Sequence, residues 1–395
     1  MEPNGALSGF RIVELCSGLC GPYATMRMGD AGADVIKIEP PEGDVARRFA
    51  TVADGVDAPA FLAVNRNKRS LALNLKSPQG KSIFLDLIKT ADVVVENYRP
   101  GAMERMGLTY EALHGANPGL IYVAMSGFGQ SGPYAKRRVY DPVIQAVSGI
   151  ADSQSDREGT PQLIQSIVAD KVAALTVAQT ITAALYAKAK GNGGQYIEFN
   201  MLMAALAFQW PDAMYNLTFT DPAVARTPDF ADFYDIMPTK DGFVTVIVIS
   251  DDEFVDFTRA AGKPDLAKDP RFANVFLRLQ NAEALKGEMK TLMATFETAE
   301  IVNRLEAEDV PHARVLKRAE VIDDPQVKFI KALVSSTHPK AGPMREPRPA
   351  ANFSMTPSTI RRPAPALGEH TSEILRELGK TDTDIAALRA SGTVA

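Results

Sequence analysis

Two short apolar runs near the N-terminus constrain the fold of this chain more than any other feature. They cover residues 10–15 (FRIVEL) and 33–38 (ADVIKI), and between them lie a Gly-containing turn at 18–22 and a short helical segment at 23–29. A strand, a helix and a second strand in this order form a β-α-β unit, whose strands are parallel and whose crossover is right-handed. Because ligands of such sheets gather at the carboxyl ends of the strands, we expect a site at that edge.

This unit imitates a dinucleotide-binding fingerprint without matching it. Glu39 follows Gly18 by 21 residues, close to the spacing at which such folds place an acidic residue for a ribose. The turn Gly18-Leu19-Cys20-Gly21-Pro22 departs from G-x-G-x-x-G, and Pro22 has no N–H to offer a phosphate. We therefore expect no bound NAD.

The alternation of strands and helices continues through the first half of the chain. Further strands are predicted at 70–75, 92–95, 120–125 and 195–199, with helices at 78–89, 102–114, 171–188 and 201–210. This order predicts a Rossmann-like, doubly wound α/β domain over residues 1–210. Asn97, Ser126 and Gly127 follow predicted strands directly, where sites in such sheets lie.

The second half of the chain predicts a smaller domain and a returning tail. Residues 211–235 lack periodicity and are interpreted as a linker. Residues 236–330 combine a strand at 242–249 with helices at 252–261, 281–294 and 298–308, which predicts a small α/β domain. Residues 331–395 are expected to form a Pro-rich linker and a C-terminal helix (371–378) that returns to the large domain.

Composition excludes several classes of protein. The net charge of −5 argues against nucleic-acid binding, and neither a membrane span nor a signal peptide is indicated, so we expect a cytoplasmic protein. Cys16 and Cys20 do not have the spacing of a redox pair or a zinc site, and the four histidines are far apart in sequence. We expect no metal, and no serine-triad motif is found.

Basic residues cluster in the predicted large domain. They are Arg66, Lys68, Arg69 and Lys76, then Arg99 and Arg105, then Lys136, Arg137 and Arg138. Most such runs are solvated surface charges. The alternative is that loops at strand ends present cations to a phosphate-bearing ligand.

Asp170 stands at the head of an apolar helix rich in small residues. On local sequence alone it is expected to cap that helix, because Asp is a preferred N-cap residue. The alternative is a nucleophilic carboxylate on a wall of small side chains, open to a bulky substrate. The local pattern does not separate these two roles.

Several motifs resemble the class III CoA-transferases, also called the CaiB/BaiF family, over nearly the whole chain. The motifs are 32–39 (GADVIKIE) with Gly43-Asp44, 65–71 (NRNKRSL), 91–101 (ADVVVENYRPG), 105–108 (RMGL), 126–129 (SGFG) and 132–134 (GPY). The resemblance implies a two-domain subunit that interlocks with an identical subunit, with coenzyme A as co-substrate. It also implies Asp170 as the catalytic residue.

The resemblance assigns further site residues. Those implied to contact CoA are Lys76, Asn97, Tyr98, Arg99, Arg105 and Arg138. Leu19, Tyr140 and Asp141 are implied to line the acyl pocket. The racemase branch of the family has a histidine where this chain has Tyr140, and tyrosine titrates far above pH 7, so transfer is favoured over racemisation. Leu19 replaces a glutamine, and the glycine-rich lid loop is not seen between residues 229 and 242, which argues against formyl or oxalyl specificity.

The expected reaction is transfer of CoA from an acyl-CoA to a free carboxylic acid, through an aspartyl anhydride and an aspartyl-CoA thioester on Asp170. Backbone N–H groups at the helix start are expected to support the oxyanions. Arg47, Arg137 and Arg226 are candidates for a second substrate carboxylate, which suggests succinate or a C5 diacid. Two alternatives stay open: a 2-methylacyl-CoA racemase and a non-catalytic CoA-binding protein.

Overall fold

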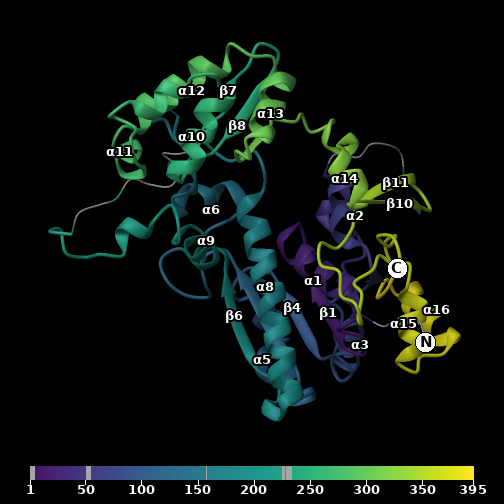
Figure 1. Ribbon diagram of the computed structural model, residues 1–395. Helices are drawn as coiled ribbons and strands as arrows, with labels where there is room; N and C mark the ends of the chain where they lie inside the picture. The colour runs from purple at the N-terminus through teal and green to yellow at the C-terminus, as the bar shows by residue number, and fades with distance from the viewer. Residues whose placement is uncertain (1–4, 50–54, 157, 225–226, 228–233) are drawn as a thin grey trace. The chain divides into compact units, whose positions relative to one another are not determined.

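The computed structural model describes residues 5–49, 55–156, 158–224, 227 and 234–395. The chain divides into two compact units. The large unit comprises Met1–Phe208 and Phe329–Ala395, and the small unit comprises Gln209–Lys328 (Figure 1).

The large unit alternates strands and helices as the sequence predicts. In chain order it contains β1 (Arg11–Leu15), α1 (Cys20–Asp30), β2 (Asp34–Glu39), α2 (Pro59–Asn65), β3 (Lys68–Ala72), α3 (Pro78–Ile88), β4 (Val93–Glu96), α4 (Ala102–Met106), α5 (Tyr110–Ala116), β5 (Ile121–Ser126), α6 (Asp141–Ser148), α7 (Ile150–Ser153), α8 (Val168–Ala187), β6 (Tyr196–Asn200), α9 (Met201–Gln209), β10 (Leu333–His338), β11 (Gly342–Pro347), α15 (Thr371–Glu377) and α16 (Asp382–Ala390).

A six-stranded parallel sheet, in the order β3-β2-β1-β4-β5-β6, forms the centre of this unit. The register places Val13 of β1 opposite Ile36 of β2 and Val94 of β4. The strand order reverses direction between β1 and β4, which is the switch point of a doubly wound sheet. The predicted fold class is thereby confirmed.

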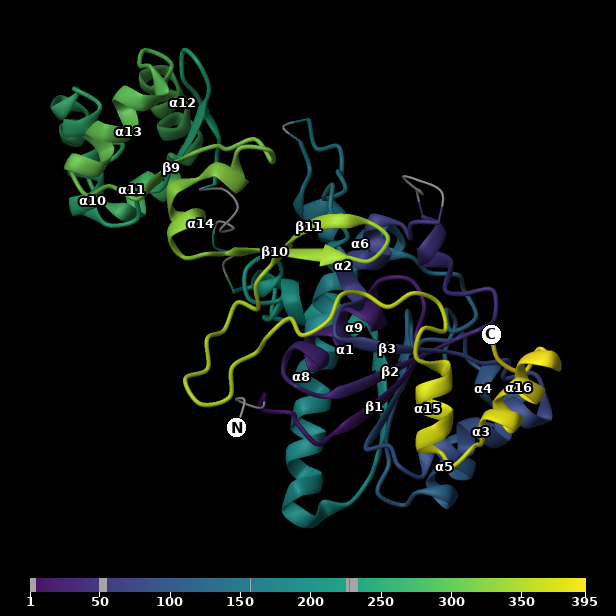
Figure 2. The same cartoon turned by 90° about the vertical axis from the view of Figure 1, so that its right-hand side faces the viewer.

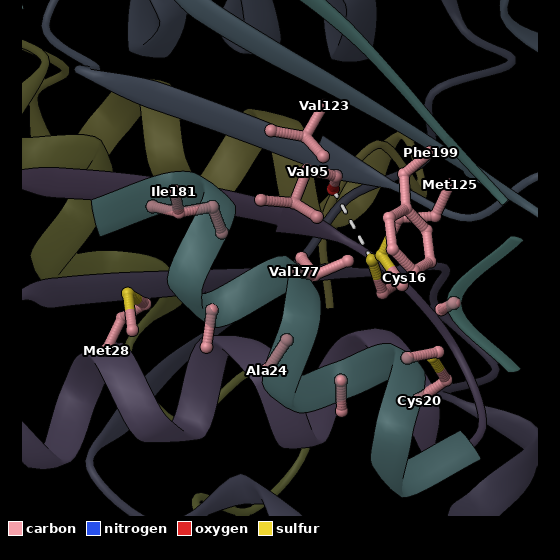
Figure 3. Close-up of a cluster of buried hydrophobic side chains, with 14 of the residues drawn as sticks. Cys16, Cys20, Ala24, Met28, Val95, Val123, Met125, Val177, Ile181 and Phe199 are labelled. Carbon is pink, nitrogen blue, oxygen red and sulfur yellow. Dashed lines mark hydrogen bonds between the residues drawn. The ribbon is translucent and has the colours of Figure 1, made fainter. Parts of the chain in front are cut away.

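Helices cover both faces of the sheet. On one face α1 and α8 lie side by side, and Ala24, Val177 and Ile181 pack with Val95 and Val123 of the sheet (Figure 3). On the other face, α3, α5 and the C-terminal helices α15 and α16 pack around residues such as Phe84 and Ile374 (Figure 2). The stretch Val168–Asn192 has the length and hydropathy of a membrane-spanning helix, but its buried residues belong to this core.

The small unit has its own core and a three-stranded antiparallel sheet, in the order β7-β8-β9. Its elements are β7 (Met237–Pro238), β8 (Phe243–Val246), α10 (Asp251–Ala260), α11 (Val275–Gln280), α12 (Ala282–Met293), α13 (Thr298–Ala307), β9 (His312–Arg314) and α14 (Pro325–Phe329). A capping box of Ser250 and Glu253 begins α10.

Three local predictions are wrong for identifiable reasons. The helix predicted at 102–114 is two helices, because Gly107 adopts the left-handed conformation (φ 71°) that ends α4. The Pro-rich tail contains the hairpin β10–β11, whose outer positions accommodate Pro343 and Pro347. Helix α1 begins at Cys20, inside the predicted turn, and Gly21 lets it approach β1, since a Cβ there would lie 2.4 Å from the Cys16 sulfur.

A fully buried ion cluster supports the turn between β1 and α1. Glu14 lies between two lysines that, like it, are 0% exposed: Lys37 Nζ is 2.9 Å from one carboxylate oxygen and Lys68 Nζ is 2.7 Å from the other. Burial acts to raise the pKa of Glu14, but the two ammonium groups outweigh it and hold that pKa at about 2. Burial lowers the pKa of Lys68 to about 8, despite the nearby carboxylate.

The same lysines bind the backbone of the turn. Lys37 donates to the Cys16 carbonyl at 2.8 Å, and Lys68 donates to the Pro22 carbonyl at 2.8 Å. Asp44, paired with Lys37 at 2.9 Å, accepts the Gly18 amide at 3.2 Å. The buried charges therefore fix the path of residues 16–22.

Replacing Glu14 by Gln is expected to destabilise the large unit by ~3–5 kcal/mol, because two buried lysines lose their anion. The measurement is the free energy of unfolding in urea near neutral pH. As a matched control, Asp86→Asn removes the surface pair with Lys89 and should cost less than ~1 kcal/mol. Equal effects of the two substitutions would contradict the structural role of the cluster.

Candidate active site

A cavity of about 190 Å³ opens beside the first turn of α8. Its walls are largely apolar side chains from the β1–α1 turn, α1, α2 and the start of α8. The lining residues are Leu19, Tyr23, Ala63, Val64, Ile167, Asp170 and Lys171. Asp170 is the one acidic residue among these lining residues, and Leu19 lines the same cavity.

Asp170 does not cap its helix. Helix α8 begins at Val168 with Ile167 at the N-cap, and no side chain caps it. Asp170 is the third residue of the helix, and no described residue donates a hydrogen bond to its carboxylate. The prediction of a capping role is wrong, and the carboxylate is left available to a ligand.

Burial, and then the nearby Asp141 carboxylate, raises the pKa of Asp170 from 3.8 to about 6. A helix N-terminus favours the ionised form, so these two effects outweigh the helix dipole. At neutral pH the group is ionised but poorly solvated. An anion in that condition is a stronger nucleophile than one in water.

Asp141 and Gln145 hold Asp170 in place from α6. Asp141 is 3% exposed, and its Oδ2 accepts the Asp170 backbone N–H at 3.0 Å. Its Oδ1 accepts the Gln145 side-chain amide at 2.5 Å. Gln145, 1% exposed, also accepts the Ile164 amide at 3.0 Å and donates to the Ser166 carbonyl at 3.2 Å. Asp141 thus supports the site through the backbone of Asp170 and is not among the cavity-lining residues.

The first turn of α8 offers fewer backbone donors than the sequence suggested. The Val168 amide donates to the Ser166 carbonyl at 2.7 Å, the Asp170 amide to Asp141, and the Lys171 amide to the Ile167 carbonyl at 3.2 Å. Three of the first four amides are therefore engaged within the protein. The expected row of oxyanion donors at this helix start is not present.

Asn97 spans the switch point of the sheet. Its side chain accepts the Ser17 amide and donates to the Ser17 carbonyl, both at 2.9 Å. These bonds join the carboxyl ends of β1 and β4, where the strand order reverses. The β1–α1 turn held in this way carries Leu19 to the Asp170 cavity.

The basic residues of the large unit fall into two groups. Lys76, Arg99, Arg105 and Arg138 are exposed, and none forms an ion pair with another described residue. Arg66, Lys68 and Arg69 are instead buried and paired with Asp30, Glu14 and Asp34 respectively. These three residues are therefore neither solvated surface charges nor free to bind a ligand. The four exposed residues keep a positive charge that could bind an anion. Tyr98 is half-buried, and burial raises its pKa to about 12.

The three arginines that were candidates to bind a second substrate carboxylate differ in burial and in their contacts. Arg47 is buried, binds Glu39 through two nitrogens at 2.7 Å, and also pairs with Asp57. Arg137 is exposed and stacks on the Tyr134 ring at 3.7 Å. Arg226 lies outside the described residues. Arg47 is therefore ruled out as a free anion receptor.

Tyr140 and the remaining candidates contribute little to the cavity. Tyr140 is the N-cap residue of α6, is 74% exposed and does not line the cavity. Cys16 and Cys20 are buried free thiols, and burial, followed by Asp170, raises the pKa of Cys20. Within the described parts of the chain no three His, Cys, Asp or Glu side chains group as metal ligands.

Sequence reasoning missed six residues of the site. Ala63, Val64 and Ile167 carry no chemical signal, and Tyr23 and Lys171 stand in the sequence only as parts of predicted helices. Gln145 lies one helical turn after Asp141, so the Asp-x-x-x-Gln spacing placed both side chains on one helix face. That spacing was the available signal.

Replacing Asp170 by Asn is expected to stabilise the protein above about pH 7, by ~1–2 kcal/mol. The folded-state pKa, about 6, lies above the ordinary value of 3.8, so the wild type loses stability as pH rises between these values. Thermal unfolding midpoints near pH 8 and pH 4 measure the difference, which should vanish at the lower pH.

The control is Asp152→Asn on α7, whose carboxylate is exposed. This substitution should give no pH-dependent gain. A wild type as stable as Asp170→Asn at both pH values would contradict the raised pKa of Asp170.

Comparisons with known proteins identify the family. CoA-transferase family III matches residues 7–371. The human succinyl-CoA:glutarate CoA-transferase is 33% identical over 395 residues, covering 98% of this chain and 90% of the human protein. The succinate–glutarate CoA-transferase of Agrobacterium fabrum is 33% identical over 382 residues, covering 94% of this chain and 95% of that protein.

A solved structure agrees with these sequence relatives. The crystal structure of a CaiB/BaiF family protein from Brucella suis superposes with a TM-score of 0.83 at 31% identity, covering 95% of this chain and 100% of that one. The chain belongs to CoA-transferase family III, the CaiB/BaiF family, and is a CoA-transferase.

Proposed function

We propose that this family III CoA-transferase moves CoA from a dicarboxylic acyl-CoA to a free dicarboxylic acid, such as succinate or a C5 diacid, with Asp170 as the covalent carrier. The observation that carries this proposal is the Asp170 carboxylate, which accepts no hydrogen bond from a described residue and faces an apolar cavity with its pKa raised to about 6. Both relatives described above are named for succinate and glutarate.

The first half of the reaction loads CoA onto Asp170. A carboxylate oxygen of Asp170 attacks the thioester carbonyl, the C–S bond breaks, and an acyl-aspartyl anhydride and CoA thiolate result. The thiolate then attacks the aspartyl carbonyl of the anhydride. The donor acid leaves with the bridging oxygen, and an aspartyl-CoA thioester remains.

The second half runs the same steps with the acceptor acid. Its carboxylate attacks the aspartyl-CoA thioester and releases CoA thiolate, which then attacks the acceptor carbonyl of the new anhydride. The acceptor leaves as its CoA thioester and Asp170 is regenerated as a carboxylate. A carboxylate suits this cycle because it serves in turn as nucleophile and as leaving group, whereas a serine ester would be too stable to exchange.

The proposed CoA contacts are the exposed basic residues near the carboxyl ends of the strands. Lys76, Arg99, Arg105 and Arg138 have charges that no described acidic residue neutralises. Phosphate groups are bound by such cations and by loops at strand ends. Asn97 and Tyr98 precede Arg99 directly at the switch point of the sheet. We therefore propose that the nucleotide end of CoA lies on one side of the β1–α1 turn and its thioester end on the other.

Racemisation has less support than transfer. It needs a second group that exchanges a proton near neutral pH, and Tyr140 is exposed and absent from the cavity lining. A protein that only binds CoA would not need a carboxylate with a raised pKa at Asp170, nor the hydrogen bonds of Asp141 and Gln145 that position this residue.

An identical partner subunit is also proposed. Helices α6, α8 and α9 carry exposed apolar side chains, which include Val143, Val147, Leu175, Met203 and Phe208. Large exposed apolar surfaces mark protein interfaces. An interlocked homodimer would cover them.

Replacing Asp170 by Ala is expected to lower CoA transfer from succinyl-CoA to glutarate by at least ~10³-fold, because no covalent carrier remains. Transfer is measured by chromatography of the CoA thioesters. Isothermal titration should show CoA binding within about threefold of the wild type, since the CoA contacts are proposed elsewhere. Transfer at a near-normal rate would refute the role of Asp170.

The pH dependence of kcat/KM is expected to report the pKa of Asp170. Because the ionised form attacks, activity should fall as pH drops through about 6. Asp141→Asn removes one of the two causes of the raised pKa, so it should move this acid limb to lower pH while keeping an oxygen that can accept the Asp170 amide. An acid limb at the same pH in both proteins would contradict the proposed electrostatics.

A further inference from the structure

A dicarboxylic substrate in the Asp170 cavity brings a second negative charge. When one carboxyl group reacts at Asp170, the other must lie a few bonds away. Burying a carboxylate against apolar walls without a partner is strongly unfavourable. A site for dicarboxylates therefore needs a cation near the reacting carbon.

Lys171 is the one cation among the cavity-lining residues. It follows Asp170 directly in the first turn of α8. The surface of the cavity is almost entirely apolar, so Lys171 lines it mainly with its aliphatic stem, and the residue as a whole is exposed. Arg47, the earlier candidate, is held by Glu39 and Asp57.

The charge of Lys171 is not neutralised within the described protein. Its Nζ donates to the hydroxyl of Ser166 at 2.7 Å, and it forms no ion pair with a described acidic residue. Asp170 is not its partner, since the causes of the raised Asp170 pKa are burial and Asp141. A lysine ammonium has three donors, so two remain for a ligand while Ser166 fixes the third.

The size of the cavity agrees with a short diacid. Its volume is about 190 Å³, and an apolar protein cavity of ~150 Å³ holds benzene, a ring of six carbon atoms. A chain of four or five carbon atoms fits this space. A longer acyl chain would extend past the rim.

We propose that Lys171 binds the distal carboxylate of the substrate, and so selects four- and five-carbon dicarboxylates over monocarboxylates of the same length. This inference rests on the proposed transfer through Asp170 and adds the residue that determines substrate class. Ser166 is a positioning residue that orients the Lys171 ammonium.

The test compares matched acids with one donor, succinyl-CoA, in the full-length protein. The acceptors are succinate against butyrate and glutarate against valerate, each labelled with carbon-13 so that CoA transfer to succinate can be told apart from the unlabelled succinyl-CoA supplied. The measured quantity is the ratio of kcat/KM between the two members of each pair, followed as labelled CoA thioester. In Lys171→Met both ratios should fall about 10- to 100-fold, the range expected for a lost charge-assisted hydrogen bond. The loss should appear mainly in KM for the diacid, which contacts Lys171 before and during reaction.

Two further variants make the result specific. Lys171→Arg keeps the positive charge, so its ratios should remain within about threefold of the wild type. Lys190→Met removes an exposed lysine close after the end of the same helix, and its ratios should equal those of the wild type. A general effect of removing a lysine from this part of the chain would appear in both Met variants.

Different outcomes overturn different claims. If Lys171→Met lowers transfer to diacids and monoacids by the same factor, or leaves the ratios unchanged while Asp170→Ala is inactive, Lys171 does not select the substrate and the proposed transfer mechanism stands. If the wild type shows no preference for diacids, the selectivity itself is refuted. If the wild type transfers CoA to none of the four acids, the proposed function fails.

Discussion

The buried carboxylate of Glu14, held between Lys37 and Lys68, is the interaction on which the site geometry depends. It keeps two ammonium groups in the protein interior, where they bind the Cys16 and Pro22 carbonyls at the two ends of the β1–α1 turn. A buried lysine without an anionic partner would either become neutral or move toward solvent. The turn fixed in this way positions Leu19 and Tyr23 as walls of the cavity that Asp170 enters.

A second, smaller network positions Asp170 and raises its pKa. Asp141 accepts the backbone amide of Asp170 and, as a nearby negative charge, acts with burial to raise its pKa. One residue thus orients Asp170 and contributes to its raised pKa. Lys171, which also lines the cavity, carries a positive charge that does not pair with Asp170.

The sequence predicted the architecture well because strand-helix alternation is a local pattern. The parallel sheet followed from periodicity, whereas the catalytic role of Asp170 is implied by the family resemblance and stays a prediction. The roles of charged residues did not follow, because burial is a property of the folded chain. Lys68 and Lys76 look alike in sequence, yet one is buried against Glu14 and the other is exposed. The sequence placed Asp170 at the N-cap position, but α8 begins two residues earlier, at Val168.

Oxygen-18 transfer tests the central claim, that the Asp170 carboxyl group is itself exchanged in each cycle. The acceptor acid is labelled with oxygen-18 in its carboxylates, the enzyme turns over with an unlabelled acyl-CoA, and the peptides are then analysed by mass spectrometry. The mechanism predicts that the bridging oxygen of the second anhydride stays on the enzyme, so label enters the peptide that contains Asp170. Turnover that leaves Asp170 unlabelled, or that labels another carboxylate such as Asp141, would contradict the account.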